Sequence, residues 1–144
     1  MVSPRAFKSH FPYEMMPCGM PSTTPGKYIY VARNPKDVVT SFFHHYYMFP
    51  FYPKYEWDEC FEKFMKGEVD FGDYFDHVLG WWAHKDDDNV LFLKYEDMKK
   101  DLPSAVDKIA KFIGQDISKE LVDEIAHKTT FANMKEDSTA NRKQ

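Results

Sequence analysis

Residues 27–48 read KYIYVARNPKDVVTSFFHHYYM, and this stretch decides the fold. It begins with a run of β-branched and aromatic side chains, which predicts a strand at residues 27–32 that is buried on both faces, as in a parallel sheet. Asn34 is a good helix N-cap, and Pro35 suits the first position of a helix. Apolar side chains then recur at helical spacing, so a helix should follow and end near Met48.

The segments on either side continue this alternation. Amphipathic patterns predict four further helices, at residues 57–65, 73–84, 103–113 and 118–127. A second buried strand is expected at residues 90–93, and a brief strand at residues 6–9 that Pro12 ends. Residues 14–26 and the aromatic stretch 49–55 predict loops, whereas the tail beyond Phe131 shows no strong pattern. Buried strands that alternate with amphipathic helices indicate an α/β protein with a mostly parallel sheet.

The composition is that of one globular domain. The chain has 144 residues, of which 43% are hydrophobic and 29% charged. A net charge of −4 without a dense basic run argues against nucleic acid as the main partner. Cys18 and Cys60 lie far apart, which excludes a disulfide scaffold and a cysteine-based zinc site. No segment is apolar enough for a membrane span or a signal peptide, so we expect a soluble, cytoplasmic protein without a metal.

The junction between the first long strand and its helix is where a parallel sheet usually binds a ligand. The free N–H groups and the dipole of a helix N-terminus favour a phosphate, and Arg33 adds a fork of donors that matches phosphate geometry. Ser41 follows two turns along the helix and could donate its hydroxyl to the same anion. An ion pair between Arg33 and Asp37 and an ordinary helical role for Ser41 are the alternatives. For each residue alone, that alternative is the better interpretation.

The same stretch closely resembles the 3'-phosphate-binding segment of the cytosolic sulfotransferases. Further segments are similar to motifs of that family in the right order, namely residues 7–12, 64–69, 81–82, 93–99 and 129–135. The resemblance implies a P-loop-like three-layer α/β fold with a mostly parallel central sheet flanked by helices, truncated in this chain. It also implies a sulfotransferase that moves a sulfuryl group from 3'-phosphoadenosine-5'-phosphosulfate (PAPS) to the hydroxyl or amine of a small organic acceptor. Adenosine 3',5'-bisphosphate (PAP) would be the product.

By this resemblance, five residues bind the nucleotide. Arg33 and Ser41 would hold the 3'-phosphate, and Tyr95, Thr129 and Phe131 would contact the adenine. A tyrosine that covers the core at the end of a strand is an equally good interpretation of Tyr95. Burial in the core is a serious rival interpretation for Phe131.

The resemblance also assigns the catalytic residues. His10 would take the proton from the acceptor hydroxyl, because an imidazole has its pKa near working pH. Lys8 would share the strand face of His10 and stabilise the charge that builds on the bridging oxygen. A histidine hydrogen-bonded at a strand end and a solvated lysine near a chain start are the alternatives.

The acceptor site is expected on the helix and loop that follow. The resemblance places His45 and Phe51 beside the acceptor, and His45 stands where phenol-sulfating members usually have phenylalanine. With 13 Phe, 9 Tyr and 3 Trp, the chain has the rings for an aromatic pocket, and equally for an aromatic core.

Two motifs of the family are missing from the chain. These are the loop that cradles the 5'-phosphosulfate and the later glycine-rich segment that closes over the 3'-phosphate. We therefore expect residues 1–144 to be a fragment of a single sulfotransferase domain, which in full length could form a homodimer. The alternative function is a catalytically incomplete fragment that only binds PAP. A nucleotide kinase is disfavoured because no Gly-x-x-x-x-Gly-Lys-Ser/Thr motif occurs.

Overall fold

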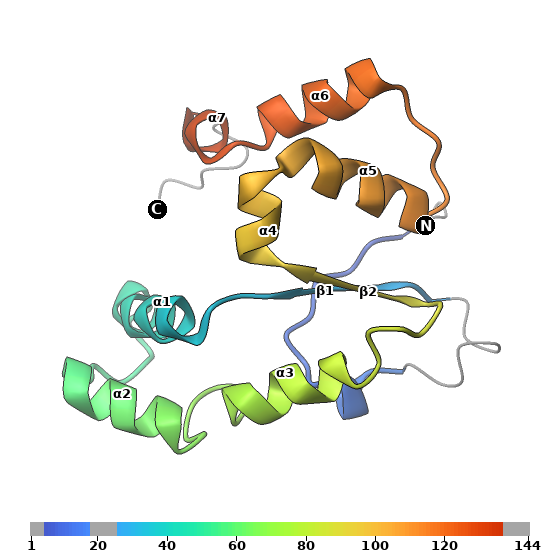
Figure 1. Cartoon of the computed structure of the whole chain (residues 1–144). Coiled ribbons are helices and arrows are strands. Elements are labelled where there is room, and N and C mark those ends of the chain that lie inside the picture. Colours follow the sequence, from blue (N-terminus) through green and yellow to red (C-terminus); the bar gives the residue numbers. More distant parts are fainter. Residues whose placement is uncertain (1–4, 18–25, 137–144) are drawn as a thin grey trace. The chain divides into compact units, whose positions relative to one another are not determined.

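The computed structural model describes residues 5–17 and 26–136. The chain divides into two compact units, Met1–Phe92 and Leu93–Gln144, and each is described by itself. Figure 1 shows the strands and helices in chain order, from blue to red. In the described part of the chain, no helix is both long enough and apolar enough to cross a membrane.

Among the described residues, two strands form the sheet. β1 (Tyr28–Ala32) and β2 (Val90–Lys94) pair in parallel, and each leads into a helix (Figure 1). The N–H of Tyr28 donates to the carbonyl of Asn89 at 2.8 Å, which begins the pairing. The α/β class predicted from the sequence is confirmed.

One face of β1 packs into an aromatic cluster. The ring of Tyr30 stacks on Trp81 of α3 (Tyr74–Trp82), with centroids 5.0 Å apart and planes inclined by 17°. Phe92 of β2 lies 5.2 Å from the same tyrosine ring. Trp81 and Val90 are buried at the centre of this cluster. The cluster therefore joins the sheet to α3 through ring contacts.

The opposite face of β1 is open to solvent. Ile29 and Val31 are 41% and 45% exposed, so the prediction that this strand is buried on both faces is wrong. The reason is the pleat: successive side chains point to opposite faces, and the aromatic cluster takes only the face of Tyr30. In β2, Val90 and Leu93 are buried, in line with the prediction.

The helix after β1 begins and ends where the sequence predicts. α1 runs over Pro35–Met48, and the side chain of its N-cap Asn34 accepts a hydrogen bond from the N–H of Lys36 at 3.0 Å. α2 (Trp57–Met65) packs against α1. Their buried side chains are Val39, Tyr46, Cys60 and Phe64.

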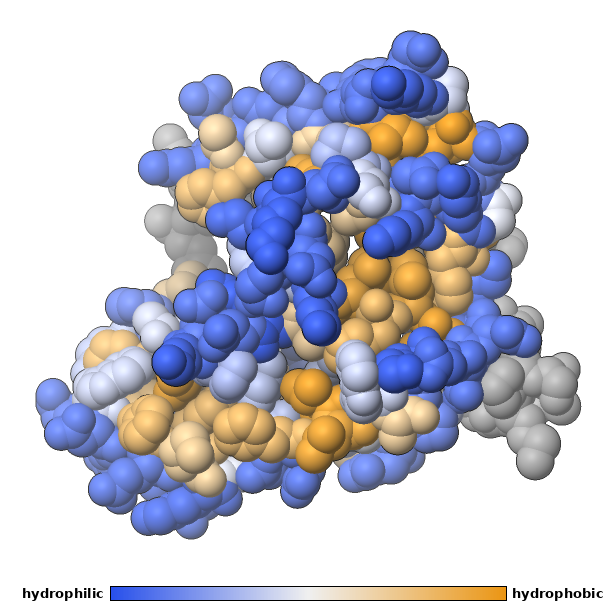
Figure 2. All heavy atoms as spheres, in the orientation of Figure 1, coloured by the Kyte–Doolittle hydropathy of each residue, from blue (hydrophilic) through white to orange (hydrophobic). Residues whose placement is uncertain are grey.

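Apolar side chains also remain on the surface of α2 and α3. Figure 2 shows hydrophobic surface in the lower part of the view, where Figure 1 places these two helices. Trp57, Phe61, Leu79 and Trp82 are all more than two-fifths exposed. α3 ends at Trp82, two residues before the predicted end, because residues 83–89 form turns.

The second unit is helical beyond the end of β2. It contains α4 (Tyr95–Lys100), α5 (Leu102–Phe112), α6 (Lys119–Lys128) and α7 (Phe131–Glu136). α5 and α6 pack on each other and bury Ala105, Ala110, Val122 and Ala126. α5 and α6 confirm two predicted helices, whereas α7 was not predicted. It is only 6 residues long, which is too short to show an amphipathic period.

The predicted strand at residues 6–9 is wrong. Residues 5–12 have no regular secondary structure, and Pro12 precedes a 3₁₀ helix, η1 (Tyr13–Met15), which overlaps the start of the predicted loop 14–26. Residues 18–25 of that loop, with Cys18, lie outside the described residues. The two carbonyls that follow the predicted strand, those of His10 and Phe11, bond to side chains of α3 and not to a neighbouring strand.

Gly67 ends the turn after α2 in a left-handed conformation, with φ at +69°. A Cβ atom there would lie 3.0 Å from backbone atoms of Asp73, the N-cap of α3. We expect Gly67→Ala to lower the free energy of unfolding by more than the roughly 1–2 kcal/mol of a left-handed residue, because the new methyl group also displaces Asp73. Urea unfolding measures the difference.

Gly72→Ala is the matched control. Gly72 also has a positive φ, +78°, but a Cβ there meets nothing within 4 Å. Its variant should show the conformational effect alone. Equal losses in the two variants would contradict a steric role for the contact between Gly67 and Asp73.

Candidate functional site

His10 lies in the irregular segment before η1 and is accessible to solvent. Its ring centroid is 5.2 Å from that of Phe71. Lys8 is also exposed, and because residues 5–12 are not a strand, the expected shared strand face of Lys8 and His10 does not exist. The two side chains are nevertheless close enough for the Lys8 charge to act on His10.

Phe71 is a residue that the sequence analysis did not single out. It has a positive φ of 69°, which is an uncommon and strained conformation for a bulky side chain. Its ring lies beside His10 and is 47% exposed. The one signal in the sequence is the following Gly72, which marks a turn before α3. The strained backbone of Phe71 therefore lies next to His10, the candidate base.

The surroundings of His10 favour its neutral form. Partial burial lowers the pKa of His10 below its ordinary value of 6.5, and electrostatic interaction with Lys8 and, to a smaller extent, with the ionisable rings of His45 and His77 lowers it further. His45 comes from α1 and His77 from α3, so two helices contribute to this electrostatic effect. A neutral imidazole is the form that can accept a proton.

Two side chains of α3 hold the backbone of this segment. His77 Nε2 lies 3.1 Å from the carbonyl oxygen of His10, and Trp81 Nε1 donates to the carbonyl of Phe11 at 3.3 Å. From the sequence, Trp81 was noted only within a family-like segment, residues 81–82, and His77 was not a predicted site residue. Their spacing of four residues, which places both on one helix face, is a pattern that could have pointed to them.

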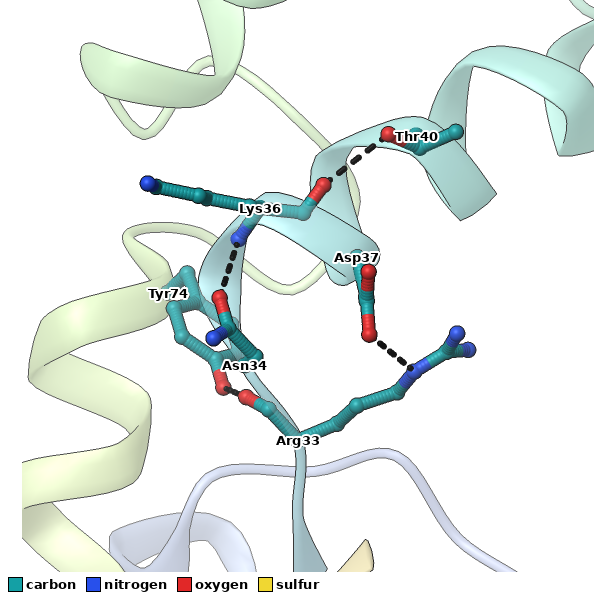
Figure 3. A network of polar contacts seen from close by, with 6 residues as sticks. All are labelled: Arg33, Asn34, Lys36, Asp37, Thr40 and Tyr74. Atoms are coloured by element: carbon teal, nitrogen blue, oxygen red, sulfur yellow. Dashed lines mark hydrogen bonds and ion pairs between the residues drawn. The ribbon is translucent and has the colours of Figure 1, made fainter. Parts of the chain in front are cut away.

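Arg33 leaves the end of β1 and turns toward the first turn of α1 (Figure 3). Its Nε lies 3.6 Å from Oδ2 of Asp37, and its side chain is 39% exposed. This is the ion pair that the sequence offered as the alternative role. The hydroxyl of Tyr74 donates to the backbone carbonyl of Arg33, so α3 also fixes the end of β1. The N-terminus of α1 and the guanidinium of Arg33 are thus brought together.

Ser41 is exposed on α1, the helix that begins just after Arg33. Between them, Thr40 does not turn its hydroxyl outward but donates to the carbonyl of Lys36 at 2.9 Å. Arg33 lies between β1 and α1, and Ser41 lies within α1, so both belong to one strand–turn–helix of the first unit. A phosphate is the chemical group that such a set of donors fits.

The predicted acceptor residues belong to an aromatic cluster at the end of α1. The ring of His45 is 4.9 Å from Phe49 and 5.5 Å from Tyr52, and the ring of Phe51 is 4.9 Å from Tyr52. Tyr52 donates its hydroxyl to Asp70 at 2.6 Å, which ties the loop to the residue before Phe71. Phe51 is 75% exposed. The structure thus brings His45 and Phe51 into one cluster.

The remaining predicted residues are in the second unit. Tyr95 begins α4, and Nζ of Lys99 lies 6.0 Å from the centre of its ring. Thr129 caps the end of α6 and donates its hydroxyl to the carbonyl of Ile125 at 2.8 Å. Phe131 begins α7 and is 77% exposed, so its alternative role as a core residue is wrong.

Comparison with known proteins gives a match over the whole chain. A model of the family described as "Sulfotransferase domain" matches residues 1–144. Sulfotransferase 1C2 of Rattus norvegicus is 42% identical over 145 residues, which cover 99% of this chain and 48% of that protein. The amine sulfotransferase of Oryctolagus cuniculus is 48% identical over 134 residues, or 92% of this chain and 44% of that protein. The chain spans about half the length of the curated relatives that it matches.

Solved structures are similar over the same region. A mouse sulfotransferase complexed with PAP has a TM-score of 0.82 and 44% identity, covering 90% of this chain and 46% of that one. Retinol dehydratase in complex with androsterone and the inactive cofactor PAP has a TM-score of 0.79 and 36% identity, covering 90% of this chain and 37% of that one. Both structures contain PAP.

The charges around His10 predict how it titrates. We expect its pKa to lie below 6.5, because burial and nearby positive charge disfavour the imidazolium. Lys8→Met removes one of these charges and should raise the pKa, though not fully, because burial is the larger cause. An NMR titration of the His10 ring measures both values.

Lys8→Arg keeps the charge and serves as the control, with a pKa close to that of the unchanged chain. A His10 pKa at or above 6.5, or the same pKa in the methionine variant, would contradict this account of the site.

Proposed function

The chain belongs to the sulfotransferase domain family, and from this we propose that it is part of an enzyme that transfers a sulfuryl group from PAPS to a small organic acceptor. The membership confirms the resemblance seen in the sequence. The observation that carries the proposal is His10, an accessible imidazole whose surroundings lower its pKa and so favour its neutral form. A neutral imidazole can act as the general base of such a transfer.

In the proposed reaction, His10 accepts the proton of the acceptor hydroxyl as the acceptor oxygen attacks sulfur. The bond between sulfur and the bridging oxygen of the donor breaks, and its electron pair stays on the 5'-phosphate of PAP. Charge builds on that bridging oxygen, so a nearby cation stabilises the transition state. Lys8 is our candidate for this role, because its charge acts within the same site as His10.

We assign the 3'-phosphate of the nucleotide to Arg33, Ser41 and the first turn of α1. The junction offers a guanidinium at the start of a 14-residue helix, where free N–H groups and the helix dipole favour an anion. In the structure, Asp37 occupies one side of the Arg33 guanidinium. Phosphate binding would therefore compete with this ion pair or share the guanidinium with it. The PAP in two similar solved structures supports a nucleotide of this kind.

We assign the adenine to Tyr95, Thr129 and Phe131. The exposed ring of Phe131 is available for stacking on the base. Tyr95, in the same unit, is the first residue of α4. Stacking of a base on an aromatic ring is worth about 1–3 kcal/mol. These three assignments rest on the family motif and, for Thr129 and Phe131, on their exposure.

The acceptor is proposed to lie beside the aromatic cluster of His45 and Phe51. The cluster offers flat apolar surface, and His45 adds a polar group near His10. A hydroxyl or an amine on a small organic molecule fits this mixture. One curated relative is an amine sulfotransferase, which supports keeping amines among the acceptors.

The cytoplasmic location, the homodimer of the full-length protein and the single domain over residues 1–144 stay predictions. The alternative function, in which the chain binds PAP without catalysis, is one outcome of the experiments below.

Arg33→Ala should weaken PAP binding. Loss of a hydrogen bond to a charged group weakens the binding free energy by about 1.5–3 kcal/mol, which corresponds to a roughly 10- to 150-fold higher Kd for PAP. Calorimetric titration with PAP measures the change. Asp37→Asn is the matched control, since it removes the competing carboxylate and should leave the affinity unchanged or tighten it. An arginine variant that binds as tightly as the unchanged protein would remove Arg33 from the site.

His10→Ala should abolish sulfuryl transfer in the full-length protein but leave PAP affinity nearly unchanged. The base contacts the acceptor and not the 3'-phosphate, so turnover and nucleotide binding should separate. Turnover is assayed with PAPS and a mixture of phenols, alcohols and amines. PAP binding without turnover in the unchanged protein would favour the alternative function. Equal loss of binding and turnover in the variant would contradict the role of His10 as a base.

A further inference from the structure

Side chains of α3 hold the segment that carries His10. His77 and Trp81 lie four residues apart, on the same face of the helix. Their ring nitrogens lie 3.1 Å and 3.3 Å from the carbonyl oxygens of His10 and Phe11. Two successive carbonyls of an irregular segment are thus bonded by two successive turns of one helix.

The hydrogen bonds of His77 determine its tautomer. A carbonyl oxygen can only accept, so the proton must be on Nε2 of His77. In the neutral ring, Nδ1 is then an acceptor. The hydroxyl of Tyr30 lies 3.0 Å from Nδ1 and therefore donates to it. Each nitrogen of His77 has a defined partner, one in the sheet and one in the His10 segment.

Tyr30 is well suited to hold this ring. It lies on β1, its ring stacks on Trp81, and it is also 5.7 Å from the ring of His77. Burial raises the pKa of the Tyr30 phenol far above its ordinary value, with a smaller contribution from Tyr74. The hydroxyl therefore stays protonated and remains a donor. The sheet, which is the most regular part of the first unit, is linked in this way to His77.

We propose that His77 is a positioning residue for His10, which fixes the His10 backbone through Nε2–H while Tyr30 fixes the ring of His77. The inference rests on the proposed function, because the position of His10 affects the rate only if His10 is the base. The bond reaches the carbonyl of His10, so the imidazole of His10 is left to the acceptor. A misplacement of about 1 Å in a catalytic group can lower a rate about 100-fold.

The hydrogen-bonded link can be tested without catalysis. In the chain labelled with ¹⁵N, long-range correlation spectra at neutral pH should show His77 as the neutral Nε2–H tautomer. Tyr30→Phe removes the donor to Nδ1 and should shift the Nδ1 resonance of His77 while Nε2–H remains. An Nδ1–H tautomer, or no shift in the Tyr30 variant, would overturn the proposal.

Kinetics in the full-length protein test the consequence. His77→Phe keeps a ring of similar volume but has no N–H, and we expect kcat to fall about 10- to 100-fold with little change in the KM for PAPS. His77→Gln keeps an N–H near the position of Nε2 and should recover most of the rate. Asp107→Asn is the control, because Asp107 pairs with Lys111 on α5 of the second unit and not with the His10 segment, and its kcat should be unchanged.

The outcomes separate this proposal from the function on which it rests. Equal rates in the two His77 variants, once thermal unfolding shows that both are folded, would overturn the positioning role. An unimpaired His10→Ala enzyme would overturn the proposed function instead, whereas the tautomer of His77 and its response to Tyr30→Phe would still stand.

Discussion

The indole of Trp81 is the contact on which the rest of the first unit depends. It stacks on Tyr30 of β1 and meets the ring of Tyr13 edge-on at 5.2 Å, so it joins the sheet, α3 and η1. A buried indole needs a partner for its N–H, and the carbonyl of Phe11 supplies it. Burial of one side chain therefore brings the irregular N-terminal segment to the sheet. The candidate catalytic residue is in that segment, and its position follows from this packing.

Side chains of α3 fix the backbone at both parts of the candidate site in the first unit, the His10 segment and the Arg33 junction. Tyr74, His77 and Trp81 follow one another at spacings of three and four residues, which puts them on one face of the helix. Each donates to a backbone carbonyl, and the three acceptors are Arg33, His10 and Phe11. The proposed phosphate ligand and the proposed base are thus fixed by the same helix face. With His77 in its neutral form, none of the three donors is charged, so none of them offers an anion a second site of positive charge.

The sequence predicted the elements around the decisive stretch well, because their causes are local. The Asn34 cap, the proline that follows it and the end at Met48 of α1 were all predicted, as was the ion pair of Arg33 with Asp37 as an alternative. The failures have non-local causes. The strand at residues 6–9 does not form, and the carbonyls of His10 and Phe11 that follow it bond instead to side chains of α3, 67 and 70 residues away in sequence. Burial of β1 on both faces was wrong because burial depends on what packs against the sheet.

By itself, the sequence determined the α/β class, the strand–turn–helix that presents Arg33, and the family, since local propensity and ordered motifs carry that information. It also named His10, Lys8, His45 and Phe51, but the one geometric relation it predicted for the catalytic pair, a shared strand face of Lys8 and His10, was wrong. Only the tertiary structure placed His45 and His77 beside His10, put the strained Phe71 against its ring and gave both nitrogens of His77 a partner. The physical reason is that hydrogen bonds and electrostatic effects depend on distance in space. The residues concerned are far apart in the chain, and the buried ring of Trp81 joins β1, α3 and η1, the elements around the His10 segment.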